Sequence, residues 1–540
     1  MPTPARFTHG LVTSPNYLAT LAGVDILRRG GNALDASLAT AATLACVYPH
    51  MCTLGGDGFW LIYAKSKGRL LGLNASGRSG KKATISAYEN LGYTDMPKRG
   101  YLAANTVPGL VSGFEAVHTF SQKELNSKIS WANLFESARL YARDGFPVSA
   151  SLAKWSKKYF EANKLAPAQN PLSEELAKVF FPGYSPLKVG QIFCQPDLAK
   201  SIERLMDYGW ADFYEGELAS QIIGDIEEHG GFLGRDDFLS HKANWVEPIS
   251  INYRGYTAAN LPPNTQGLAS LVILNILNNF HLTKYAEGSS DYYHLLIEAT
   301  KEAFLDRDTY LSDPEVVDIP VKELLSVKHG QAQAARINLK LAQKDLGPLD
   351  PHGDTVYVGC VDRDGNAVSM IQSIYYDFGS AVVPKNTGII LQNRGCYFSL
   401  DPKHVNALCP EKRTFHTLNP AMLLEDGRPY LIYGTMGGEG QPQAQAQLVT
   451  RILDYHLDVA QAIDRPRFLY GRSWGNQTNK VFLEARIPKS VGQDLGSRGH
   501  PIEYLADYED LMGMAGLILC KQDLFEGSND PRSDGLALGF

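Results

Sequence analysis

The sequence lacks the paired cysteines of a disulfide framework or a zinc site. Its seven cysteines, at positions 46, 52, 194, 360, 396, 409 and 520, are odd in number, scattered, and never form a CxxC pair. Disulfide-rich secreted domains and zinc modules need more regular cysteine spacing. We therefore expect reduced thiols and a cytoplasmic location.

Long hydrophobic runs and an excess of basic charge are also missing. No stretch approaches the roughly 18 consecutive apolar residues of a membrane-spanning helix. The opening residues, MPTPARFTHG, contain no apolar core of signal-peptide length. The formal net charge of −7 is modest and does not suit a phosphate backbone or an anionic lipid surface. We expect neither a nucleic-acid partner nor a membrane partner.

Motifs that bind phosphate or metal are absent as well. The glycine cluster at 54–58 has neither GxGxxG nor GxxxxGK[ST] spacing, which argues against a nucleotide site. The histidines form no HExxH or other paired-ligand spacing. Asp354 and Asp362 read as turn residues rather than as a carboxylate pair for acid–base chemistry. The sequence therefore predicts a site that needs no metal and no other cofactor.

What the chain does contain is a mixture of helix and strand patterns. A length of 540 residues exceeds one ordinary core, so we expect two or more structural units. Ser14 and Pro15 suit the start of a helix that ends at Gly30-Gly31, and residues 131–300 are mainly helical in pattern. Strand patterns occur at 59–73, 247–261, 356–374, 387–393 and 421–433. This mixture indicates an α+β protein.

The most informative stretch is a predicted β-hairpin between Gly353 and Ile374. Residues 356–361 alternate as in a strand that is buried on at least one face. Residues 362–366 form a turn signal in which Gly365 can take a positive φ, and an apolar run then returns. Thr355 therefore lies where a polar loop meets a buried strand.

A threonine at this junction has two interpretations. Its hydroxyl is a poor nucleophile unless a base lies beside it. A chain break directly before Thr355 would free an α-amine, with a pKa of roughly 7.7–8.0, within reach of its own Oγ1. Alternatively, Thr355 is only a β-branched residue that opens a strand.

Motifs along nearly the whole chain resemble the γ-glutamyltransferase family of N-terminal nucleophile hydrolases. They are Asp354-Thr355, Val-Asp-x-Asp-Gly-Asn-Ala-Val at 361–368, Phe-Gly-Ser at 378–380, Gly-Gly-Asn-Ala-x-Asp-Ala at 30–36 and Gly-Gly-x-Gly-Phe at 55–59. The resemblance implies an αββα sandwich and self-cleavage between Asp354 and Thr355. A large fragment, 1–354, and a small fragment, 355–540, would remain together as a heterodimer. A dimer of these heterodimers is a further expectation.

The resemblance also implies supporting roles for three residues. Gly437 and Gly438 match the pair that forms the family's oxyanion hole. They precede a helix, whose unpaired N–H groups favour negative charge. Without the resemblance, the two glycines are equally consistent with a tight strand-to-helix turn. Ser373 matches a hydroxyl residue that contacts the nucleophile in the family.

The substrate-binding positions depart from the family pattern. Typical members hold the substrate α-carboxylate with an Arg, and its α-amino end with an Asn and an Asp. The matching positions here are Ser76, Tyr375 and Tyr397, with Arg78 two residues from Ser76. The family's paired serines become His416-Thr417. Because a phenol cannot replace a carboxylate that balances a positive charge, we expect a substrate that does not require an amine.

Arginine side chains suit a carboxylate on the substrate instead. The expected substrate-binding residues are Arg78, Tyr375, Arg394, Tyr397, His416 and Thr417. The arginines, tyrosines and histidine also have ordinary interpretations, as surface, packed or core residues. With Tyr-Pro-His at 48–50 and Thr-Met-Gly-Gly-Glu-Gly-Gln-Pro at 435–442, the set resembles the oxamate amidohydrolase branch of the family.

The sequence therefore predicts a self-cleaving amidohydrolase that forms an acyl-enzyme on Thr355. Its expected substrate is a small amide that bears a carboxylate, with oxamate, giving oxalate and ammonia, as the best candidate. One alternative is a γ-glutamyltransferase or glutathione hydrolase that holds the substrate amine in another way. Another is a non-catalytic binding protein on the same fold.

Overall fold

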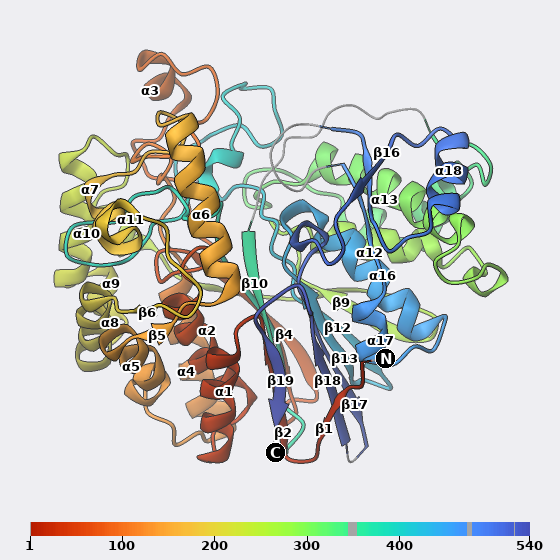
Figure 1. Ribbon diagram of the computed structural model, residues 1–540, viewed down its shortest axis with the longest axis horizontal. Coiled ribbons are helices and arrows are strands. Elements are labelled where there is room, and N and C mark those ends of the chain that lie inside the picture. The colour runs from red at the N-terminus through yellow and green to blue at the C-terminus, as the bar shows by residue number, and fades with distance from the viewer. Residues whose placement is uncertain (1, 344–353, 472–477, 523) are drawn as a thin grey trace.

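Two antiparallel sheets lie face to face, and helices cover the outer side of each (Figure 1). The computed structural model describes residues 2–343, 354–471, 478–522 and 524–540. The order of layers is helix, sheet, sheet, helix. The αββα sandwich expected from the sequence is therefore confirmed.

The first sheet carries Thr355 on an interior strand. Its order is β19-β2-β10-β11-β3-β4-β7. The strands are β2 (Gly10–Ser14), β3 (Asp57–Ala64), β4 (Arg69–Ala75), β7 (Asn244–Val246), β10 (Asp354–Asp362), β11 (Ala367–Tyr375) and β19 (Leu536–Gly539). β10 and β11 form the predicted hairpin, with Gly365 at φ 87° in its turn.

The second sheet packs against the inner face of the first. Its order is β1-β18-β17-β13-β12-β9-β8. The strands are β1 (Ala5–Phe7), β8 (Ile249–Tyr253), β9 (Tyr256–Asn260), β12 (Ala421–Glu425), β13 (Arg428–Thr435), β17 (Ala515–Lys521) and β18 (Leu524–Asn529). Phe59 and Ile371 of the first sheet share one buried cluster with Met422, Ile432 and Ile518 of the second.

The helices divide into two outer layers (Figure 1). Those whose side chains cluster with the first sheet are α1 (Tyr17–Arg28), α2 (Ala33–Val47), α4 (Leu110–Leu125), α5 (Glu136–Asp144), α6 (Ala150–Leu165), α7 (Glu174–Phe180), α8 (Pro196–Tyr208), α9 (Ala211–Tyr214), α10 (Glu217–Glu228) and α11 (Arg235–Ser240). Those that cluster with the second are α12 (Gly267–Leu277), α13 (Ser290–Tyr310), α14 (Val321–Leu324), α15 (Val327–Ala334), α16 (Gln441–Leu453), α17 (Val459–Asp464) and α18 (Lys489–Ser497).

Smaller elements complete the described chain. Helix α3 (Ile85–Asn90) packs in a separate small cluster. Two short sheets pair β5 (Phe146–Pro147) with β6 (Ile192–Phe193), and β14 (Phe468–Tyr470) with β15 (Val481–Glu484) and β16 (Ile502–Leu505). No helix in the described ranges is both long enough and apolar enough to cross a bilayer.

The alternation of side chains along β10 fixes the strand between the layers. Val356, Val358 and Cys360 belong to the cluster under the first helix layer. Tyr357 points to the other sheet, where its ring lies 2.2 Å from the place a Cβ would take on Gly434 and 2.9 Å from that on Gly516. The period of two in the sequence therefore holds, and two glycines opposite make room for the one large ring.

Two local predictions are wrong. Helix α1 begins at Tyr17, because Asn16 is its N-cap and accepts a hydrogen bond from the Leu18 N–H at 2.9 Å, while Ser14 ends β2. Residues 387–393 form no ladder; Leu391 makes only an isolated bridge with Gly55. Their backbone groups bond instead to loops, as in Gln392 N–H to the Gly55 carbonyl at 2.9 Å.

Candidate active site

Thr355 lies at a break in the pairing between β10 and β11. Asp354 pairs with Tyr375 and Val356 with Gln372, so one extra residue of β11 is accommodated opposite Thr355. Bulges of this kind re-aim side chains and are frequent beside active sites. Thr355 is fully buried, and its Oγ1 lies 3.5 Å from Nε2 of Gln441.

Ser373 reaches the same place from the end of β11. Its Oγ accepts hydrogen bonds from the Tyr375 backbone N–H at 2.7 Å and from the Arg394 guanidinium at 3.3 Å. Tyr375 has a φ of 80°, which a residue with a side chain rarely adopts. Such strain is stored where the surrounding structure requires it, as at a binding site.

Gly437 and Gly438 form the turn between β13 and α16. Their φ angles are 123° and 51°, and both residues precede a short 3₁₀ turn, Gly438–Gly440. Within the described ranges, neither amide N–H has a hydrogen-bond acceptor. The Gln266 amide fixes the turn, because its Nε2 donates to the carbonyls of Gly438 at 2.8 Å and Thr417 at 2.7 Å. Two free N–H groups can therefore serve an oxyanion.

Arg394 is a buried cation without a carboxylate partner in the described part of the chain. Its guanidinium donates to Ser373 and to Oγ1 of Thr417 at 3.1 Å, while its Nε has no partner. It lies over the ring of Tyr375, 4.2 Å from the centroid, and 5.8 Å from that of Tyr397. Burial lowers the pKa of Arg394, although an arginine remains protonated at neutral pH. The site therefore presents beside Ser373 a positive charge that forms no ion pair in the described ranges.

His416 lies behind this cation, paired with Asp57. Its Nε2 is 3.1 Å from Oδ2 of Asp57, and both side chains are fully buried. Burial, and then the charge of Arg394, lower the pKa of His416 well below its ordinary value. Because Nδ1 accepts the Leu418 N–H at 3.4 Å, the neutral ring donates from Nε2. His416 is thus a buried residue that packs behind Arg394, bonded to Asp57, and is not exposed to the cavity.

Asp57 is the hydrogen-bond partner of His416. Its Oδ1 accepts hydrogen bonds from Gln392 and from the backbone N–H groups of Gly77 and Gly109, at 2.9 to 3.2 Å. Burial nevertheless raises the pKa of Asp57 to about 6, against the opposing charge of Arg394. Asp57 is therefore a hydrogen-bonded buried carboxyl group that interacts with Arg394 electrostatically and forms no ion pair with it.

A cavity of about 550 Å³ adjoins the cluster through Tyr397 and Glu439. The Tyr397 hydroxyl donates to Oε1 of Glu439 at 2.9 Å, and Oε2 of Glu439 lies 3.1 Å from the Arg307 guanidinium. Its lining mixes charged, polar and apolar side chains, among them Asp95, Lys98, Arg307, Leu311, Phe398 and His404. A cavity of this size accommodates a drug-sized molecule.

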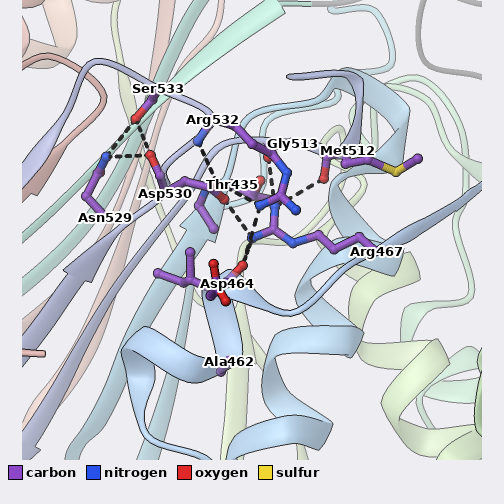
Figure 2. Close-up of polar contacts among 12 residues, drawn as sticks. Thr435, Ala462, Asp464, Arg467, Met512, Gly513, Asn529, Asp530, Arg532 and Ser533 are labelled. Atoms are coloured by element: carbon purple, nitrogen blue, oxygen red, sulfur yellow. Dashed lines mark hydrogen bonds and ion pairs between the residues drawn. The ribbon is translucent and has the colours of Figure 1, made fainter. Parts of the chain in front are cut away.

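Figure 2 shows a buried ionic network around Arg467 that includes Gly513. The Arg467 guanidinium donates to the Gly513 carbonyl at 2.7 Å and to Asp530 at 2.6 Å. Burial alone would raise the pKa of Asp530, but Arg467 and Arg532 hold it below its ordinary value. Gly513 in turn lies against Gly437, since a Cβ on Gly437 would be 3.3 Å from the Gly513 Cα.

The structure thus brings most of the expected residues together, but not Arg78. Thr355 lies at the bulge opposite Ser373, and Ser373 accepts a hydrogen bond from Arg394. Tyr375, Tyr397, His416 and Thr417 contact Arg394, its neighbours or the cavity. The guanidinium of Arg78 instead binds Glu315 at 2.8 Å and Asp313 at 3.3 Å. The expectation that Arg78 lines the substrate site is therefore corrected: its charge is already balanced by two carboxylates.

Five further residues of the site were not found from the sequence. They are Asp57, Gln266, Arg307, Glu439 and Gln441. Three of them carried a signal: Glu439 and Gln441 lie in the motif at 435–442, and Asp57 occupies the variable position of the motif at 55–59. Gln266 and Arg307 come from α12 and α13, far away in sequence, and only the packing of these helices on the second sheet places them here.

Comparison with known proteins places the whole chain in a defined group. The family model described as gamma-glutamyltranspeptidase matches residues 19–540. The chain is 44% identical over 534 residues to the glutathione hydrolase-like YwrD proenzyme of Bacillus subtilis, and 41% identical over 535 residues to the oxamate amidohydrolase proenzyme of Klebsiella pneumoniae. Both alignments cover 99% of each chain. The crystal structure of cephalosporin acylase from Bacillus halodurans superposes with a TM-score of 0.91 at 35% identity, covering 100% of this chain and 97% of that one.

Proposed function

The chain belongs to the gamma-glutamyltranspeptidase family of N-terminal nucleophile amidohydrolases, and on that premise we propose that Thr355 is its nucleophile. The relatives are named as proenzymes, which implies a chain that becomes two associated fragments. We place the cut between Asp354 and Thr355. Thr355 lies at a bulge opposite Ser373 and contacts Gln441, three residues after the glycine pair, and this position supports the role.

Cleavage would use the hydroxyl before any amine exists. Oγ1 of Thr355 attacks the carbonyl carbon of Asp354, the C–N bond breaks, and the nitrogen keeps its electron pair and takes a proton. Water then hydrolyses the resulting ester and leaves the Asp354 carboxylate and a free α-amine on Thr355. In turnover this amine accepts the hydroxyl proton, as the adjacent base in an N-terminal nucleophile.

The same groups then act on the substrate amide. Oγ1 attacks the amide carbonyl, and the N–H groups of Gly437 and Gly438 receive the oxyanion. The C–N bond breaks as the protonated amine passes its proton to the leaving nitrogen. Water attacks the acyl-enzyme by the reverse proton path and regenerates Thr355.

We propose that the substrate carries a carboxylate close to the scissile amide, and oxamate is our first candidate. The observation that carries this proposal is Arg394, a buried guanidinium with a free Nε and no carboxylate within ion-pairing distance among the described residues. A substrate carboxylate would balance that charge with a bidentate pair. The oxamate amidohydrolase relative supports the choice.

The cavity beside Glu439 favours a second candidate, a larger amide. Its volume of about 550 Å³ far exceeds the size of oxamate. A bulky leaving amine, or a longer acyl group, would fill the space between α13 and the segment 396–406. The superposition with a cephalosporin acylase is consistent with this candidate.

A substrate panel separates these candidates. Cleaved protein is assayed for ammonia from oxamate, for amine from N-substituted oxamates, and for aniline from a γ-glutamyl anilide. We expect the oxamates to exceed the anilide in kcat/KM by at least about 10²-fold, because Tyr375 and Tyr397 stand where the family holds the substrate ammonium, and Glu439 is already paired with Arg307. N-substituted oxamates that outperform oxamate would favour the larger amide. Efficient turnover of the anilide would contradict the carboxylate proposal.

The glycine turn gives a further prediction. Gly437→Ala should lower kcat by on the order of 10²- to 10³-fold, because an alanine at φ 123° is strained and displaces the oxyanion donors. The matched control is Gly427→Ala, a positive-φ glycine with nothing within 4 Å of the added Cβ. We expect the control to keep its kcat. Steady-state rates beside thermal melts test this, and equal kcat values in the two variants would exclude Gly437 from the oxyanion site.

A further inference from the structure

Gln441 contacts the proposed nucleophile through only one end of its side-chain amide. It is the first residue of α16 and is fully buried. Its Nε2 approaches Oγ1 of Thr355 at 3.5 Å, while its Oε1 has no hydrogen-bond partner in the described part of the chain. Buried polar atoms are normally paired, so this unpaired acceptor beside the nucleophile points to a missing donor.

Cleavage before Thr355 would create such a donor. In the uncut chain, the Thr355 nitrogen is an amide with one N–H. After the cut it becomes an amine with two N–H groups, or an ammonium with three, on the residue that Gln441 already contacts. These new donors arise in a buried place and need acceptors.

We propose that Gln441 is a positioning residue for the α-amine of Thr355 in the cleaved protein. Its Oε1 accepts one N–H of the amine, and its Nε2 donates to Oγ1. The amine lone pair is then directed to the hydroxyl proton, which moves from Oγ1 to the nitrogen when Oγ1 attacks. This inference rests on the proposed role of Thr355.

Two other glutamines of α16, Gln443 and Gln445, use their side-chain amides differently from Gln441. Gln443 uses both ends of its amide on the backbone of Tyr470, at 3.0 and 2.7 Å. Gln445, one turn after Gln441, donates to the Asn419 carbonyl at 2.8 Å. Gln445 also leaves its Oε1 unpaired in the described ranges, but it makes no hydrogen bond to Thr355 there. Gln445→Met is therefore a matched control for the loss of a buried amide.

The test measures the α-amine directly. Cleaved wild type, Gln441→Met, Gln441→Glu and Gln445→Met are carbamylated with cyanate at a series of pH values. The mass of the N-terminal peptide of the small fragment then reports the rate at Thr355. A hydrogen bond to the charged form favours that form, so removing it in Gln441→Met should lower the amine pKa by roughly half a unit to one unit. The carboxylate in Gln441→Glu should raise it by about one unit or more.

Opposite shifts in the two Gln441 variants, with Gln445→Met at the wild-type value, would support the inference. A common amine pKa in all four proteins would overturn it, even if Gln441→Met lost activity. If Gln441→Met does not fold, Gln441→Glu decides alone by shifting or not shifting. The proposed function fails separately, since a wild-type protein without a fragment beginning at Thr355 would contradict the nucleophile itself.

Discussion

Thr355→Ala should yield a single uncut chain of 59.3 kDa with no detectable amidase activity. The variant removes the one atom, Oγ1, that the proposal uses both to cut the chain and to attack the substrate. Loss of the nucleophile in acyl-transfer enzymes costs on the order of 10⁶-fold in kcat, so turnover should fall below detection. Intact mass spectrometry and an ammonia-release assay measure the two consequences.

Thr355→Ser is the matched control, because it keeps the hydroxyl and removes only a methyl group. It should still give two fragments that meet at 354/355, with slower cleavage. The alanine variant should fold as the wild type does, since it removes only part of a buried side chain. A cut alanine variant, or a wild type that is active without being cut, would show that Thr355 is not the nucleophile.

Arg394→Met should lower kcat/KM for a carboxylate-bearing amide by on the order of 10²- to 10³-fold, because an unpaired substrate charge would then be buried. The loss should appear mainly in KM if Arg394 holds the carboxylate equally in the ground and transition states. A neutral amide such as acetamide should lose little. This difference between substrates distinguishes binding of the carboxylate from general damage to the site.

The thermal stability of Arg394→Met, unlike its activity, should not fall. Arg394 is buried, and no carboxylate of the described residues is close enough to form an ion pair with it. A well-packed apolar side chain often replaces such a buried charge without loss of folding stability. Thermal melts of Arg394→Met should therefore match or exceed those of the wild type. Arg394→Lys tests geometry, since it keeps the charge but loses the planar fork. An equal loss for acetamide and oxamate would remove Arg394 from the carboxylate site.

The parts of the fold that follow from local chemistry were predictable. The β10–β11 hairpin rests on strict alternation and on a glycine in its turn, and both are present in the structure. The start of α1 was missed because the Ser14-Pro15 pair suits a helix start, whereas Asn16, two residues after Ser14, is the residue that caps the helix. The segment 387–393 was missed because an apolar run does not reveal whether a neighbouring strand is available to pair with it.

The candidate site divides in the same way. Thr355, Ser373 and the pair Gly437-Gly438 lie in contiguous sequence motifs, so the sequence alone could identify them as candidates. Arg78 was misplaced because the nearness of an arginine to a family position says nothing about which carboxylates will surround it. Glu439 and Arg307 pair across more than a hundred residues, and only the packed helices make that pair visible.

The strand order of the two sheets would make the proposed maturation a one-way process. A cut before Thr355 would leave β10 and β11 of the small fragment inserted between β2 and β3 of the large one, and β1, β8 and β9 of the large fragment at the two edges of the other sheet. Such fragments are interleaved rather than docked, so they separate only when both sheets unravel. On this proposal the chain would have to fold before it is cut. A cleaved molecule that unfolds would have lost the covalent link that first put its strands in register, and its lifetime would be set by the rate of unfolding rather than by an equilibrium.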